Sequence, residues 1–197
     1  MRLENSKTLV GLRKLAIIII ILFWIAILSY IGVFIIERKL IYPIKNQSAV
    51  YKYCDEYDIQ PSIIFSIIKI ESGFDECAVS SKNAKGLMQI TDNTAKYIAN
   101  KLNQVNYNLF SPDTNIKFGV YYIRYLTDKF ADLATVITAY NAGEGNVTNW
   151  LENKDYSDDG IRLKVIPFRE TREYLKKFYR TLEKYRKLYG NILDKPK

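Results

Sequence analysis

A run of 22 residues without a charge, residues 15–36, is the feature that most restricts how this chain folds. The run reads LAIIIIILFWIAILSYIGVFII and is dominated by large apolar residues. At about 1.5 Å of rise per residue, a helix of this length crosses the roughly 30 Å hydrocarbon layer of a bilayer. The sequence therefore predicts a transmembrane helix at residues 15–36, preceded by a short segment at residues 1–14.

The alternative interpretation of this run is a cleaved secretory signal, whose apolar region is shorter and is followed by small residues. Here the sequence GVFIIERKL occupies residues 32–40, which favours a retained anchor. No cysteine closes the run, which disfavours a lipoprotein. Four basic residues precede the run and three follow it by residue 46, a small excess that favours an N-terminus inside the cell.

The chain contains no histidine, which removes much of the usual catalytic chemistry. Ser/His/Asp and Cys/His nucleophilic sites and HExxH zinc sites are excluded, so carboxylates, hydroxyls and tyrosines remain for acid/base work. Cys54 and Cys77 lack a CxxC spacing and enough partners for zinc, so we expect no metal and no other cofactor. The helices expected below separate the two cysteines by more than about 10 Å, which predicts free thiols.

The net charge of +8 is distributed unevenly along the chain. Residues 1–46 carry seven basic and two acidic side chains, residues 47–161 carry ten and fifteen, and residues 162–197 carry twelve and four. The basic final segment suits an anionic wall polymer, anionic lipid or nucleic acid, and it equally suits a solvated helix face. No sequence signature of a nucleic-acid-binding module supports the third of these partners.

The remaining pattern is helical, with little of the alternation expected of strands. Pro61 suits a first helical position, and Gly73, Gly143 and Gly190 suit helix ends. We expect a short linker at residues 37–46, a mainly α-helical domain at residues 47–190 and a C-terminal tail at residues 191–197. The expected helices of the domain lie near residues 47–57, 61–72, 92–102, 113–129, 131–142 and 169–189, with a loop at 152–160.

Glu71 is the acidic residue in an unusual position. On a helix at residues 61–72 it shares a face with Ile64, Ile67 and Ile68, so its surroundings are apolar. Desolvation raises the pKa of a carboxyl group, and the negative end of the helix dipole disfavours the anion by roughly 0.3–1 kcal/mol. A glutamate that stays protonated near neutral pH is suited to general acid catalysis, although a glutamate in a last turn can also bend out to solvent.

Three stretches of the sequence resemble one enzyme family. ESGFDECAVSSKNAKGLMQ at residues 71–89 is similar to the catalytic signature of the soluble, goose-type-lysozyme-like lytic transglycosylases, with its ES pair, A-x-S and GLMQ. AYNAGEGNV at residues 139–147 and IPFRETREY at residues 166–174 are similar to later motifs of that family, in the same order. Asn83 stands where the family usually has glycine, and asparagine tolerates a left-handed backbone better than most residues.

The resemblance implies a lysozyme-like α-helical fold and a role for each matching residue. It implies that Glu71 is the sole catalytic acid and base. The residues that it implies for substrate binding are Ser80 at the sugar N-acetyl group, Met88 and Gln89 lining the saccharide groove, Tyr140 and Asn141 beside the acid, and Glu170 as a brace. On spacing alone, Met88 is equally compatible with the core, Tyr140 with a packed aromatic residue, and Ser80 with a turn cap.

The resemblance also implies a lytic transglycosylase of peptidoglycan, and the transmembrane helix predicted from the apolar run would hold its domain at the membrane, facing the cell wall outside the cytoplasm. Its partners would be peptidoglycan glycan strands, the membrane through residues 15–36, and an anionic polymer or lipid at the basic C-terminal segment. Three alternatives stay open at this stage. They are a hydrolytic muramidase using Asp75 or Glu76 as a second carboxylate, a non-catalytic glycan-binding module, and a membrane-anchored nucleic-acid binder resting on the basic segment alone.

Overall fold

The computed structural model describes the backbone of residues 2–194 and the side chains of residues 12–190 and 192–194. The chain divides into two compact units, Met1–Pro43 and Ile44–Lys197. Throughout the described residues the regular structure is helical, and extended pairing is limited to isolated bridges. The expectation of a mainly α-helical chain is therefore confirmed. Residues 195–197 of the expected tail lie outside the described residues.

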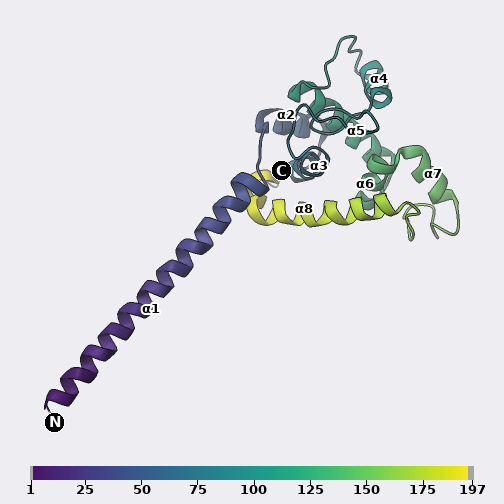
Figure 1. Cartoon of the computed structure of the whole chain (residues 1–197). Helices are drawn as coiled ribbons and strands as arrows, with labels where there is room; N and C mark the ends of the chain where they lie inside the picture. Colours follow the sequence, from purple (N-terminus) through teal and green to yellow (C-terminus); the bar gives the residue numbers. More distant parts are fainter. Residues whose placement is uncertain (1, 195–197) are drawn as a thin grey trace. The chain divides into compact units, whose positions relative to one another are not determined.

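The first unit is one long helix, α1 (Arg2–Ile36), followed directly by a π-helical turn, η1 (Glu37–Ile41) (Figure 1). The segment Leu12–Ile41 is long and apolar enough to cross a membrane, and a stretch of 18 residues within it has a mean hydropathy of 2.9. Its apolar side chains point to all sides of the helix and are exposed, as the consecutive residues Ile17, Ile18, Ile19 and Ile20 illustrate. The expected linker at 37–46 is therefore partly helical, because η1 continues the helix to Ile41.

The described part of the second unit, residues 44–194, contains seven helices, and six of them agree with the sequence prediction to within four residues at each end. The six are α2 (Gln47–Tyr57), α3 (Pro61–Glu71), α4 (Asp92–Lys101), α5 (Pro112–Lys129), α6 (Leu133–Ala142) and α8 (Arg169–Leu193). The sequence did not predict α7 (Glu144–Glu152), which begins directly after Gly143. Gly143 ends α6 as expected, whereas α8 continues through Gly190.

Helix α3 is the centre of the domain core. Every residue from Ser62 to Ile68 is buried, so α3 is enclosed on all sides rather than along one stripe. Helix α8 packs along it and also contacts α6, and Figure 1 shows α8 as the long helix below both. Phe65 of α3 stacks on Tyr185 of α8 with ring centroids 5.9 Å apart. This pairing holds the middle of α3 against the second half of α8. Near the start of α8, Tyr174 reaches Glu71 at the end of α3.

Candidate active site

Glu71 is the last residue of α3, and its carboxyl group lies between α3 and α8. Its side chain is largely buried, and the Tyr174 hydroxyl donates a hydrogen bond of 2.5 Å to Glu71 Oε1. Burial raises the pKa of Glu71 from 4.5 to about 7, while the Tyr174 hydrogen bond and the charge of Lys177 lower it. Glu170 raises this pKa further by charge repulsion. The site therefore holds a carboxyl group that titrates near neutral pH.

The backbone after Glu71 turns sharply and is tied back to the loop that forms the opposite wall. Ser72 ends α3, and its hydroxyl donates to the carbonyl groups of Ile68 and, at 2.9 Å, Leu87. Residues 78–90 fold into a compact loop with isolated bridges from Lys85 to Val79 and Ile90. The loop therefore stands beside the end of α3, where its residues can reach a molecule that contacts Glu71.

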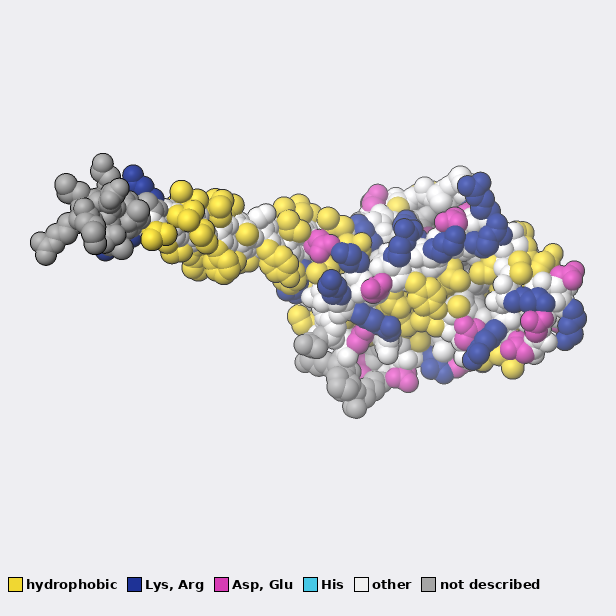
Figure 2. Space-filling view, turned by 90° about the horizontal axis from the view of Figure 1, so that it is seen from below, with side chains coloured by type: hydrophobic (Ala, Val, Ile, Leu, Met, Phe, Trp, Pro, Cys, Tyr) yellow, Lys and Arg dark blue, Asp and Glu magenta, His cyan; other side chains and the backbone are white. Residues whose placement is uncertain are grey.

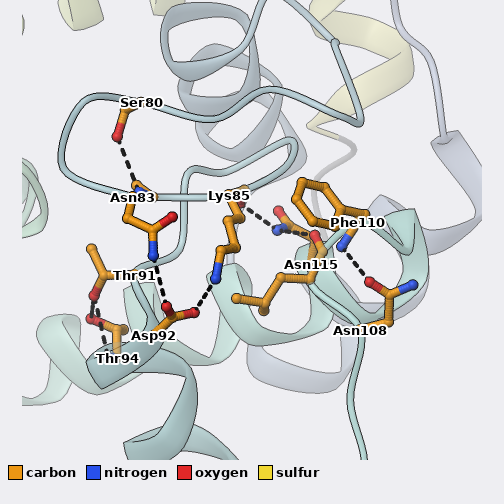
Figure 3. Close-up of polar contacts among 11 residues, drawn as sticks. Ser80, Asn83, Lys85, Thr91, Asp92, Thr94, Asn108, Phe110 and Asn115 are labelled. Atoms are coloured by element: carbon orange, nitrogen blue, oxygen red, sulfur yellow. Dashed lines mark hydrogen bonds and ion pairs between the residues drawn. The ribbon is translucent and has the colours of Figure 1, made fainter.

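Asn115 of α5 holds this loop in place through hydrogen bonds to its backbone. Its Nδ2 donates 2.8 Å hydrogen bonds to the carbonyl oxygens of Lys85 and Leu109, and its Oδ1 accepts from the Met88 amide at 2.7 Å (Figure 3). Gly86 lies so close that an added Cβ would come within 2.5 Å of Asn115 Nδ2. Because Gly86 also has a φ of 72°, a side chain there would both clash and strain the backbone.

Asn83 adopts the left-handed backbone of a turn at the position where the family usually has glycine. Its φ is 58°, in the left-handed region, and its amide donates to the Ser80 carbonyl oxygen. Its side chain donates to Asp92 Oδ2 at 2.9 Å, and Lys85 donates to the other oxygen of the same carboxylate (Figure 3). Asparagine thus supplies the backbone conformation and also anchors the turn to the start of α4.

A cleft of about 220 Å³ opens over Glu71. Five of the six residues predicted to bind substrate line it together with Glu71, and they come from the loop, α6 and α8. These five are Ser80, Gln89, Tyr140, Asn141 and Glu170, and the other lining residues are Ser81, Lys82, Ala84 and Thr91. The motifs that are far apart in the sequence therefore meet around one carboxyl group.

The expectation for the Met88 side chain needs correction. Met88 is completely buried and packs against Gly119 of α5, where an added Cβ would lie only 2.2 Å from its sulfur atom. The side chain is therefore part of the core and does not line the cleft. Its backbone does contribute, because the Met88 carbonyl oxygen accepts a 2.6 Å hydrogen bond from the Tyr140 hydroxyl. That bond fixes the half-buried Tyr140 ring in the cleft wall.

The other carboxylates near the motif are placed differently from Glu71. Asp75 and Glu76 are exposed, and their side chains accept hydrogen bonds from the Cys77 amide and from Asn46. Neither is among the residues that line the cleft. Glu170 does line it, but its side chain is 74% exposed and pairs loosely with Lys82 at 3.7 Å. Within the described lining, Glu71 is the one buried carboxyl group.

The two cysteines are the other side chains that could be reactive. Cys54 is buried in α2 and Cys77 is exposed, and each is a free thiol in the structure. Burial raises the pKa of the Cys54 thiol far above its ordinary range, so this thiol is unreactive. Among the described residues, no three His, Cys, Asp or Glu side chains gather in a group that could hold a metal ion.

Sequence reasoning missed Tyr174, Lys177 and Asn115. A signal for Tyr174 existed, because it lies four residues after Glu170 and therefore on the same side of the predicted helix. Lys177 follows one turn after Tyr174, and its Nζ approaches the Ile70 carbonyl oxygen at 3.5 Å. Asn115 gave no signal, because a single asparagine in the first turn of a helix is ordinary in sequence.

Comparisons with known proteins identify one family of relatives. Residues 48–161 match the model of the family described as the transglycosylase SLT domain. The soluble lytic murein transglycosylase of Salmonella typhimurium is 33% identical over 141 residues, covering 68% of this chain and 22% of the relative. Membrane-bound lytic murein transglycosylase C of Histophilus somni is 31% identical over 172 residues, covering 75% of this chain and 47% of the relative.

A solved structure shows the same fold. An inactive glutamate-to-glutamine mutant of the lytic transglycosylase Slt from Pseudomonas aeruginosa superposes with a TM-score of 0.65 at 30% identity. The match covers 75% of this chain and 25% of that one, so the chain spans only a fraction of its relatives' length. The expected lysozyme-like α-helical fold is thereby confirmed, and the chain belongs to the transglycosylase SLT domain family.

Proposed function

We propose that this protein is a membrane-anchored lytic transglycosylase that cleaves the β-1,4 bond between N-acetylmuramic acid and N-acetylglucosamine in peptidoglycan. The observation that carries the proposal is the largely buried carboxyl group of Glu71, with a pKa of about 7, in the lining of the cleft. The family and the names of the relatives support the substrate and the reaction. A glutamate-to-glutamine mutant of one relative is inactive, which supports a glutamate as the catalytic group.

In the first step Glu71 acts as the general acid. Tyr174 donates to Oε1, so a proton on Glu71 sits on Oε2, which leaves that oxygen to face a bound glycan. This proton passes to O4 of N-acetylglucosamine as the bond from O4 to C1 of the muramoyl residue breaks. The N-acetyl oxygen of the muramoyl residue stabilises the positive charge that develops at C1.

In the second step Glu71 acts as the base. The ionised carboxylate takes the proton from the muramoyl O6 hydroxyl, and O6 forms a bond to C1 of the same sugar. The product is a 1,6-anhydromuramoyl end, no water is consumed, and Glu71 is protonated again. Because both reacting atoms belong to one sugar, the closure is intramolecular and needs no second catalytic carboxylate. The exposed positions of Asp75 and Glu76, outside the cleft lining, fit this one-carboxylate scheme.

The cleft walls hold the glycan. Tyr140, fixed by its hydrogen bond to the Met88 carbonyl oxygen, offers an aromatic side chain to the cleft, and Asn141 and Gln89 offer amide groups. Ser80 presents its hydroxyl from the loop and accepts from the Ala84 amide, so it can contact the N-acetyl group as a donor. Glu170 closes the far wall at the start of α8. Together these groups orient the sugar ring and exclude water from C1.

The apolar helix and the relatives support a location at the membrane. One relative is named a membrane-bound transglycosylase, and Leu12–Ile41 has the length and hydropathy of a membrane span. We place the catalytic domain outside the cytoplasm, on a single span at residues 15–36, because peptidoglycan lies there. A purely soluble form of the full chain, found in the cytoplasmic fraction after cell disruption, would overturn this placement.

The basic C-terminal segment is the remaining surface with a proposed partner. Along α8 the exposed basic side chains are interspersed with Glu170, Glu173 and Glu183. On the face seen in Figure 2, Lys and Arg side chains lie among acidic and hydrophobic ones and do not form an uninterrupted patch. This mixed surface supports weak contact with an anionic wall polymer or lipid, and it gives no support for a nucleic-acid partner.

The central experiment on function is the exchange Glu71→Gln. Glutamine retains the size of glutamate but cannot donate or accept the proton, so turnover of purified peptidoglycan should fall by at least about 10² to 10⁴. Glu76→Gln is the matched control, because Glu76 lies on the same short stretch but is exposed and outside the cleft lining. Release of soluble fragments measures turnover. Full activity of Glu71→Gln, or equal losses in both variants, would refute the assigned role.

A further inference from the structure

We propose that Lys82 forms a subsite for a carboxylate on the O3 arm of the muramoyl residue. This inference rests on the proposed function and adds to it the part of the substrate that one side chain recognises. Lys82 lies in the loop of residues 78–90 and lines the cleft two positions after Ser80. Among the described lining residues it is the one that carries a positive charge.

The present partner of Lys82 is easily replaced. Lys82 Nζ lies 3.7 Å from Glu170 Oε2, and the two side chains are 77% and 74% exposed. An exposed ion pair of this kind stabilises a protein by only about 0–1 kcal/mol. The two residues belong to opposite walls, the loop and the first turn of α8. A substrate carboxylate entering between the walls can therefore take the ammonium group from Glu170 at little cost.

The chemistry of the glycan identifies the ligand. N-acetylglucosamine carries no ionised group, whereas N-acetylmuramic acid carries a lactyl ether on O3 that ends in a carboxyl group. C3 belongs to the same ring as C1, so a sugar that presents C1 to Glu71 projects its O3 arm from the same cleft. A flexible lysine with three donor protons suits a carboxylate whose position varies with the arm. Lys82 would therefore distinguish the muramoyl residue from its neighbour.

The carboxylate can come from two sources on the same arm. In glycan strands without peptides it is the free lactyl group. In strands that carry stem peptides the lactyl carboxyl forms an amide, and acidic residues of the peptide supply carboxylates instead. The shared chemistry is a carboxylate on the O3 arm, and substrates of both kinds separate the two sources.

The test measures binding in a background that cannot consume the ligand. The full chain in detergent carries Glu71→Gln, with Lys82→Gln, Lys82→Arg or the control Lys96→Gln added, since Lys96 is exposed on α4 and outside the cleft lining. The probes are short strands without peptides, the same strands with each lactyl carboxyl converted to a neutral methylamide, and strands with stem peptides. Calorimetry gives Kd for each pair.

We expect Lys82→Gln to raise Kd by about 3- to 10-fold for probes with a carboxylate on the arm, and to leave Kd unchanged for the methylamide. Lys82→Arg and Lys96→Gln should bind like the background protein. A rise confined to the strands without peptides assigns the lactyl group, and a rise confined to the others assigns the stem peptide. An equal effect on the methylamide, or no effect on any probe, would overturn the proposal.

Cleavage by the protein without substitutions, measured separately on the same strands, keeps the two proposals distinct. Cleavage without any effect of Lys82→Gln on Kd refutes the carboxylate subsite alone. Binding that depends on Lys82 without any cleavage refutes the proposed reaction and leaves the subsite supported.

Discussion

At the scale of single residues, opposing effects set the pKa of Glu71 at the end of α3. Burial raises the pKa of Glu71, and its position at the negative end of α3 acts in the same direction. The Tyr174 hydrogen bond and Lys177 act in the other direction and keep the pKa near 7. A group that must donate and then recover a proton functions best when its pKa lies near the working pH.

Tyr174→Phe tests this balance. Without the hydroxyl, the ionised form of Glu71 loses a hydrogen bond worth about 1.5–3 kcal/mol, so its pKa should rise by roughly 1–2 pH units. The limb of the pH profile of kcat/KM that reports Glu71 should move to higher pH by that amount. Tyr179→Phe is the control, because Tyr179 is exposed on α8 and outside the cleft lining. An unchanged limb, or a shift to lower pH, would show that Tyr174 does not tune Glu71.

Glu71 should also affect stability in a pH-dependent way. Its folded pKa of about 7 lies above its ordinary value of 4.5, so the fold favours the protonated form. The contribution of this group to stability is therefore fully present below about pH 4.5 and is lost as the pH rises through about 7. Glu71→Gln removes the titration, and its free energy of unfolding should exceed that of the unsubstituted protein by about 1–3 kcal/mol more at pH 8 than at pH 5.

Urea unfolding at the two pH values measures this difference. A difference between the two proteins that stays constant with pH would mean that Glu71 is not desolvated in the folded state.

The places of Glu71 and Tyr140 in the cleft and the left-handed backbone of Asn83 could be predicted from sequence, because local pattern or motif determines them. The burial of Met88 could not be predicted from sequence, since it depends on Gly119 of α5, which lies 31 positions further along the chain. The contact between Tyr174 and Glu71 joins residues 103 positions apart and depends on how α8 packs against α3. Such long-range contacts are set by tertiary packing, which local periodicity does not encode.

At the scale of elements, the same distinction explains which helices were predicted. Helix α3 has a long apolar run with proline at its start, and α5 has eighteen residues of clear periodicity. Helix α7 is only nine residues long and contains Gly145, Asn146 and two β-branched residues, so its intrinsic propensity is low. Tertiary contacts stabilise it, since Val147 and Trp150 are buried and α7 packs against α6.

Helix α8 continues to Leu193, beyond its expected end at residue 189, and the residue that follows it contacts another helix. Beyond Gly190 the chain brings Asp194 to the start of α3, where Asp194 Oδ1 accepts from the Ser62 amide at 3.2 Å. Arg186 lies 3.6 Å from the other oxygen of this carboxylate. Amide groups in a first helical turn lack partners within the helix, so Asp194 supplies one from the far end of the chain.

Asp194→Ala should lower the free energy of unfolding by about 0.5–2 kcal/mol, the usual effect of losing an acceptor at a helix N-terminus. Asp194→Asn should lose less, because an amide oxygen still accepts from Ser62. Glu183→Ala, an exposed position on α8, is the control and should change stability little. Urea unfolding provides the values. Equal stability of Asp194→Ala and the control would show that the contact contributes nothing.

At the scale of the whole molecule, the chain combines an apolar helix with a domain that has its own core. All the residues of the candidate site lie between Glu71 and Lys177, within the second unit. The apolar run and the helical domain were both predictable, because each depends on composition and period within a short window. The boundary between the apolar helix and the domain was less predictable, since η1 extends the helix into the expected linker.

Deletion of residues 1–43 should give a soluble domain that folds and keeps its activity on purified glycan strands. The second unit begins at Ile44, and the buried core residues of the described chain start at Val50. Circular dichroism and fragment release from purified strands are the measurements. An unfolded product would show that the first unit contributes to the fold, and a folded but inactive one would show that it contributes to the site.

The reaction itself is tested most directly by mass spectrometry of the fragments released from purified peptidoglycan. If Glu71 serves as acid and then base without water, the fragments carry 1,6-anhydromuramoyl ends and each is lighter by one water than the corresponding hydrolysis product. The Glu71→Gln protein should release almost none of them under the same conditions. Fragments with only reducing ends would contradict the account, because they would mean that water, and not the muramoyl O6, attacks C1.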